Sequence, residues 1–81
     1  MNKEIARLRW RCRRGTRELD QLLGGWLDDR YQQATPAARE GFARLLDHQD
    51  PDLWDWLLGQ GAPGDKDEAA VIDEIRSGHR V

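Results

Sequence analysis

The residues best suited to recognition chemistry gather in one short stretch near the N-terminus, RCRRGTRELD, from Arg11 to Asp20. Four arginines surround a single glycine, Gly15, and the carboxylates of Glu18 and Asp20 follow within five residues. Guanidinium groups pair in a forked geometry with carboxylates and phosphates. Glycine lets a backbone turn sharply or approach another surface closely. The stretch therefore predicts a recognition site at a backbone turn.

The charge of the chain is divided into two blocks of opposite sign. Residues 1–17 hold seven basic side chains and one acid, a balance of +6, whereas the remaining 64 residues hold six basic side chains and fourteen acids, a balance of -8. The net charge of -2 conceals this division. Blocks of opposite sign indicate either pairing within the molecule or a charged recognition surface.

Catalysis and metal binding are poorly supported by the residue types present. The only cysteine is Cys12, and the two histidines, His48 and His79, lie far apart in the chain without neighbouring ligands. Neither a nucleophile with an adjacent base nor a set of metal ligands can be assembled from these spacings. We expect no enzyme and no metal site. We also expect a cytoplasmic protein without membrane insertion, because no apolar run approaches about 20 residues.

Helix signals recur along the whole chain, and no alternating strand pattern is present. Helices are expected over about 2–13, from Thr16 with a stripe that includes Trp26, from Thr35, from Asp50, and from Asp65. Short Gly- and Pro-containing breaks separate them. The fold class predicted is all-α, a small five-helix bundle in which residues 1–81 form a single domain.

Several positions within these helices carry specific expectations. Trp26 and Trp54 lie on apolar stripes and are expected in the core, and Cys12 is expected to be a small buried hydrophobe. Gly24 and Gly25 interrupt a helix, which indicates close approach of a neighbouring backbone.

On a helical wheel, Arg7, Arg11 and Arg14 fall on one side of the first helix, opposite its apolar face, so they should point at solvent or a partner. Trp10 lies beside them on the polar side. The structural alternative is that Trp10 packs under the last helix or a loop and that the arginines are merely solvated. An exposed aromatic among arginines, however, is typical of an interface anchor.

Three kinds of partner could use such a face. Nucleic acid is disfavoured by the acidic isoelectric point near 5.6 and by Glu18 and Asp20 beside the arginines. A phosphate-bearing cofactor would need a glycine-rich loop, and one glycine does not make one. A protein surface fits best, because it can offer both carboxylates for the arginines and an apolar site for Trp10.

The stretch LRWRCRRGTRELDQLL, residues 8–23, resembles the RGxxE signature of the SdhE/YgfY family, the flavinylation factors of succinate dehydrogenase. A second block, LLDHQDPDLWDWLLGQGAP over residues 45–63, is similar to the other recognisable segment of that family. The resemblance covers roughly residues 5–76 and implies a small five-helix bundle, as the helix signals do.

The resemblance implies an assembly factor that binds the flavoprotein subunit of succinate dehydrogenase, and of the related fumarate reductase, and promotes covalent attachment of FAD to it. Such a protein holds no cofactor stably, acts on FAD bound by its partner, and is expected as a monomer or weak dimer. The alternatives are an antitoxin of a toxin–antitoxin pair and a basic nucleic-acid-binding module. The partner-binding residues implied or expected are Arg14, Gly15, Glu18, Arg11, Trp10, Asp20, Arg7 and Arg17.

Overall fold

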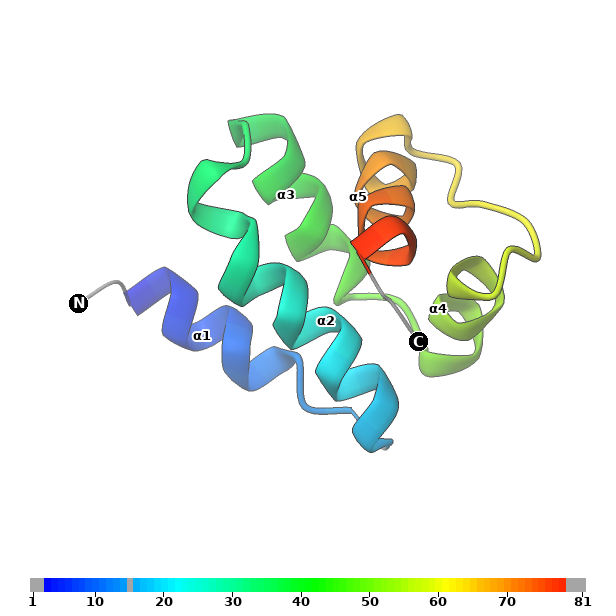
Figure 1. The fold of residues 1–81 in the computed structure, drawn as a ribbon, viewed down its shortest axis with the longest axis horizontal. Coiled ribbons are helices and arrows are strands. Elements are labelled where there is room, and N and C mark those ends of the chain that lie inside the picture. The colour runs from blue at the N-terminus through cyan, green and yellow to red at the C-terminus, as the bar shows by residue number, and fades with distance from the viewer. Residues whose placement is uncertain (1–2, 15, 79–81) are drawn as a thin grey trace.

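Helices account for most of the chain, and no strand occurs in the parts that the structure describes. The structure is a computed structural model that describes residues 3–14 and 16–78. In chain order the elements are α1 (Lys3–Arg11), α2 (Arg17–Asp29), the 3-10 helix η1 (Tyr31–Gln33), α3 (Pro36–Leu45), α4 (Asp50–Leu57) and α5 (Lys66–Gly78). The predicted all-α bundle of five helices is therefore confirmed (Figure 1).

Three of the predicted helix starts are capped by the expected side chains. Thr16 accepts a hydrogen bond from the Leu19 N–H at 3.3 Å, and Thr35 accepts one from the Ala38 N–H at 3.1 Å. Asp65 accepts the N–H groups of Asp67 and Glu68. The bond from Glu68, followed by the hydrogen bond from Arg44 and the bond from Asp67, holds the pKa of the Asp65 carboxyl below its usual range. Each cap satisfies N–H groups that a helix start leaves without partners.

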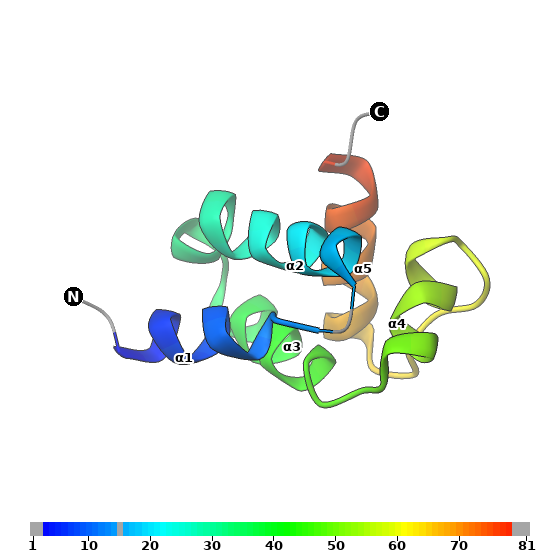
Figure 2. The same cartoon turned by 90° about the horizontal axis from the view of Figure 1, so that it is seen from below.

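Helix α5 is the element around which the others assemble. It contacts α2, α3 and α4, while α1 packs along α2. Figure 1 shows α1 and α2 running antiparallel on one side, with α3 beside α5 and α4 at the opposite end from α1. Seen from below, α5 stands across the other helices and α4 lies beyond it (Figure 2). The turn between α1 and α2 thus lies at the same end of the molecule as α4.

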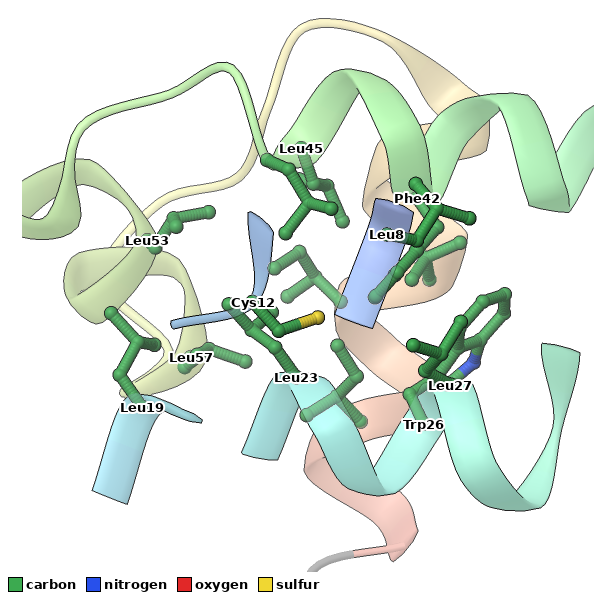
Figure 3. Packing of buried hydrophobic residues seen from close by; sticks show 14 of the residues in the cluster. Leu8, Cys12, Leu19, Leu23, Trp26, Leu27, Phe42, Leu45, Leu53 and Leu57 are labelled. Atoms are coloured by element: carbon green, nitrogen blue, oxygen red, sulfur yellow. The ribbon is translucent and has the colours of Figure 1, made fainter. Parts of the chain in front are cut away.

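The core is built from leucines and a small aromatic group. Trp26, with 3% of its surface exposed, stacks on Phe42 with ring centroids 4.6 Å apart, and meets Tyr31 edge-on at 6.0 Å. Figure 3 shows Trp26 and Phe42 together with leucines from α2, α3 and α4. The core prediction for Trp26 is confirmed. That for Trp54 is wrong, because Trp54 is only partly buried and packs against the edge of the cluster.

Glycines have contrasting roles in the helices. A Cβ on Gly41 would lie 2.9 Å from the carbonyl carbon of Asp67, so this glycine allows α3 to lie close against the start of α5. The expectation of a close backbone at Gly24 and Gly25 is wrong: a Cβ on either would meet no described atom within 4 Å. Both glycines instead border a hollow of about 360 Å³ beside α1.

Alanine substitutions should separate these two roles. We expect Gly41→Ala to lower the free energy of unfolding, by about 1–3 kcal/mol, because the added methyl overpacks the contact between α3 and α5. Gly24→Ala should raise it by about 0.5–1 kcal/mol, because alanine is the better helix former and open space surrounds it. Urea unfolding followed by circular dichroism would measure both; a stabilised Gly41→Ala protein would contradict the close approach.

Two core side chains carry ionisable groups whose neutral form the fold favours. Burial raises the pKa of the Cys12 thiol to about 11, against a smaller opposing effect from the Arg9 and Arg14 charges. Burial, and then the hydrogen bond from its hydroxyl to Glu4, raises the pKa of Tyr31 to about 12. The burial predicted for Cys12 is confirmed, with 3% of its surface exposed.

The raised pKa of Cys12 predicts a loss of stability in alkali. The unfolded chain releases the thiol proton near pH 9, whereas the folded chain holds it to about pH 11, so this contribution is complete below pH 9 and declines above it. Between pH 8 and 10.5 the wild type should lose on the order of 2 kcal/mol more than Cys12→Ala. Urea unfolding under reducing conditions measures this difference. The ionisation of Tyr31 affects both proteins equally and so does not contribute to it. Equal losses would show that the thiol ionises alike in both states.

Candidate functional site

The segment between α1 and α2 is held by the side chain of Arg14. Its Nε donates to Asp50 Oδ1 at 2.8 Å, one Nη donates to the carbonyl of Leu46 at 2.9 Å, and the other Nη donates to the carbonyl of His48. Only 14% of the side chain is exposed. The two carbonyls follow the end of α3, where main-chain acceptors lack helical partners, so Arg14 ties the first turn of the chain to the segment between α3 and α4.

The wheel-based expectation that Arg14 points at solvent or a partner is therefore wrong, because its guanidinium points at acceptors of the chain itself. Helix α1 ends at Arg11, two residues earlier than expected, and the chain leaves the helical path before it reaches Arg14. Asp20 on α2 accepts the backbone N–H of Arg14, and Thr16 caps α2. Gly15 itself lies outside the described residues, but the residue on each side of it is fixed by hydrogen bonds.

Two further arginines of α1 pair within the chain. Arg11 forms an ion pair with Asp47 and also donates to the carbonyl of Ala43 at 3.4 Å, and Arg9 pairs with Asp28 of α2. These pairs are about half exposed, so each contributes little to stability by itself. Together they neutralise two of the seven basic side chains of the positive block and join α1 to α2 and to the segment after α3.

The remaining predicted residues lie free on the surface. Trp10 has 75% of its surface exposed, so the alternative in which it packs under the last helix or a loop is wrong. Within residues 3–14 and 16–78, four exposed charged side chains of this region make no ion pair, whereas Arg9, Arg11 and Arg14 do. This exposed set, which we call the free face, comprises Arg7, Trp10, Arg13, Arg17 and Glu18.

Glu18 has no capping role in the folded chain. It is the second residue of α2, is exposed, and follows the cap that Thr16 already supplies. A carboxylate in the first helical turn interacts favourably with the helix dipole, but this effect is worth only about 0.3–1 kcal/mol. The carboxylate is therefore available to a cationic group of a partner.

A second polar cluster fastens α5 to the end of α3. Glu68, 6% exposed, lies 2.7 Å from His48 Nε2 and 3.5 Å from Arg44 Nε, while His48 meets Trp56 edge-on. Glu68 is thus a buried carboxylate with partners on both sides. Across the described residues, no group of three His, Cys, Asp or Glu side chains is placed to hold a metal ion.

Comparison with known proteins gives the context of this site. The family model described as the flavinator of succinate dehydrogenase matches residues 6–79. The chain belongs to this family. Curated relatives named FAD assembly factor SdhE are 47% identical in Xylella fastidiosa (strain 9a5c), over 91% of this chain and 76% of the relative, and 40% identical in Coxiella burnetii (strain RSA 493 / Nine Mile phase I), over 94% and 95%. A relative of the same name from Aliivibrio fischeri (strain ATCC 700601 / ES114) is 37% identical, over 90% and 85%.

The two sequence blocks that carry the family resemblance are in direct contact. Arg11 and Arg14 of the first block bind Asp47 and Asp50 of the second, and Arg14 also binds the carbonyls of Leu46 and His48. In this flavinator-family chain, part of the arginine-rich signature therefore holds the fold together. The acidic partners could not be predicted from the sequence, because 36 residues separate each pair and no local pattern marks the pairing.

Substitutions at Arg14 and Glu18 should separate an internal role from an external one. Arg14→Lys keeps the charge but cannot reach three acceptors at once, so we expect it to lower the free energy of unfolding by roughly 2–4 kcal/mol. Glu18→Ala should change it by less than about 1 kcal/mol. Urea titration at neutral pH measures both. If Arg14→Lys left the stability unchanged and Glu18→Ala lowered it, the structural role would belong to Glu18 and not to Arg14.

Proposed function

We propose that this chain is a FAD assembly factor that binds the flavoprotein subunit of succinate dehydrogenase and promotes covalent attachment of FAD to it. The observation that carries the proposal is the free face beside a fixed turn, in a chain of the flavinator family. The related fumarate reductase flavoprotein is a second substrate of the same kind. The protein acts as a single cytoplasmic domain, a monomer or weak dimer, and none of its described helices is long and apolar enough to cross a membrane.

The free face offers a mixed set of contacts to a protein. Trp10 supplies a large apolar surface, which is the type of residue that dominates protein interfaces. Arg7 and Arg17 can form paired hydrogen bonds with carboxylates of the partner, and Glu18 can accept from a basic group. Gly15 stands between the anchored Arg14 and Thr16, where the absence of a side chain would let the partner backbone come close.

In this proposal the chemistry of flavin attachment belongs to the partner. The flavin and the histidine that it modifies are both groups of the flavoprotein, and this chain contributes position and orientation. A turn held before binding by Arg14 and Asp20 loses little conformational entropy on docking, so more of the contact energy is available to fix the flavoprotein. Docking would then favour the arrangement in which the histidine meets the flavin.

Nucleic-acid binding gains no support from the site. Arg9, Arg11 and Arg14 are neutralised by aspartates of the chain itself, which leaves three arginines and one glutamate on the free face, a smaller positive excess than the sequence alone indicates. No feature of the described residues favours an antitoxin role. Steep dependence of RNA or DNA binding on salt would be the signature of the nucleic-acid alternative.

The proposal is tested in cells that lack this protein and are complemented with wild type, Gly15→Arg or the control Gly24→Ala. Covalent flavin fluorescence on the succinate dehydrogenase flavoprotein is read in a denaturing gel. We expect the signal with wild type and Gly24→Ala and its loss with Gly15→Arg, because a long charged side chain would block the close approach. Circular dichroism of the purified Gly15→Arg protein should show a folded bundle.

Equal fluorescence in complemented and uncomplemented cells would refute the assembly role. Equal rescue by wild type and Gly15→Arg would keep the role but remove the glycine from the contact. A Gly15→Arg protein that is unfolded would show that position 15 acts through the fold, and Trp10→Ala would then report on the free face.

A further inference from the structure

A groove lies between α2, α4 and α5, and Glu18 of the RGxxE stretch is one of its lining residues. Its volume is about 400 Å³, within the range of about 300–1,000 Å³ that ligand pockets span. The apolar lining comes from one residue of α2, one of α5, and the end of α4: Leu22, Ile75, Trp54, Leu57 and Leu58. Leu58 has 65% of its surface exposed, so the groove presents an apolar wall to the outside.

The groove is lined by two charges of opposite sign. Glu18 and Arg76 both line it, both are exposed, and neither makes an ion pair within the described residues. This distinguishes Arg76 from Arg30 and Arg44, which face acids of the chain. The guanidinium of Arg76 also lies over Gly59, 3.0 Å from where a Cβ would be, and Gly59 adopts a positive φ of 87° that favours glycine. The missing side chain at residue 59 thus leaves room for Arg76 at this position.

Glu18 connects the groove to the free face. It is the glutamate of the RGxxE stretch and also a lining residue of the groove, so a protein docked over the start of α2 reaches both surfaces at once. We propose that the groove binds an apolar segment of the flavoprotein subunit, with a large apolar side chain against Leu58 and Trp54. This inference rests on the proposed function and adds a second contact to it.

The charges specify the chemistry of that segment. A basic residue of the partner meets Glu18 and an acidic residue meets Arg76, on either side of the inserted apolar side chain. A flavin nucleotide fits less well, because its two phosphates would find one arginine and would be repelled by Glu18. A peptide segment with an apolar side chain and charges of both signs can cover the apolar wall and pair with both Glu18 and Arg76.

The experiment measures the affinity of the full-length chain for the purified flavoprotein subunit by titration calorimetry. Leu58→Gln removes the apolar wall, and Arg76→Glu reverses one charge. We expect each to raise Kd by about tenfold or more. Lys66→Glu is the matched control, because it makes the same charge change at an exposed position of α5 that does not line the groove; its Kd should equal that of wild type. Urea midpoints check that all three variants remain folded.

The Gly15→Arg variant, titrated in parallel, separates this inference from the function on which it rests. Wild-type affinity in both groove variants, together with lost binding in Gly15→Arg, would overturn the groove contact and leave the assembly role intact. Absence of wild-type binding would overturn both. If the groove variants changed only self-association in sedimentation velocity, a second copy of the chain would be the occupant and the inference would be wrong.

Discussion

The hydrogen bonds of the Arg14 guanidinium hold together two turns that are distant in sequence. A buried cation loses its hydration, and that loss is compensated only where several acceptors surround it. Asp50 supplies the opposite charge, and the carbonyls of Leu46 and His48 supply two dipoles that the end of α3 leaves without helical partners. The same hydrogen bonds therefore compensate the lost hydration of the guanidinium and give partners to carbonyl groups at the end of α3. For this reason one arginine can connect the turn after α1 to the segment before α4.

Helix α1 depends on this connection for its place in the fold. It has nine residues, fewer than an isolated helix needs to be stable in water. From residues 3–14, only Leu8 and Cys12 are buried in the core. The ion pairs of Arg9 and Arg11 are half exposed and contribute modestly. The position of Trp10 and of the rest of the free face therefore follows from how firmly Arg14 closes the end of α1.

Local signals in the sequence were sufficient for the five helices and for three of their caps, whereas the cap expected at Asp50 is wrong, because Asp50 is the first residue of α4 and its carboxylate accepts from Arg14. Thr16, Thr35 and Asp65 are residues whose side chains satisfy nearby N–H groups, so each helix start could be predicted within a few residues. The stripe of α2 likewise placed Trp26 in the core. The role of Arg14 could not be predicted in this way. A helical wheel assumes that the helix continues through Arg14, whereas α1 ends at Arg11, three residues before it. Its acceptors come from a segment more than 30 residues away, which only the folded chain brings near.

The division of charge between the two parts of the chain is partly paired within the molecule, because three of the seven basic side chains of residues 1–17 form ion pairs. Arginines of the positive block pair with Asp28, Asp47 and Asp50 of the negative block, and this pairing adds to a core that is thin in a chain of 81 residues. The charges left over on the free face and at the groove have both signs. A polyanion would be attracted by part of that surface and repelled by the rest, whereas a folded protein can match each charge with its opposite and cover Trp10 and Leu58 as well. The internal pairing thus favours a protein partner, because it reduces the excess positive charge that would otherwise attract nucleic acid.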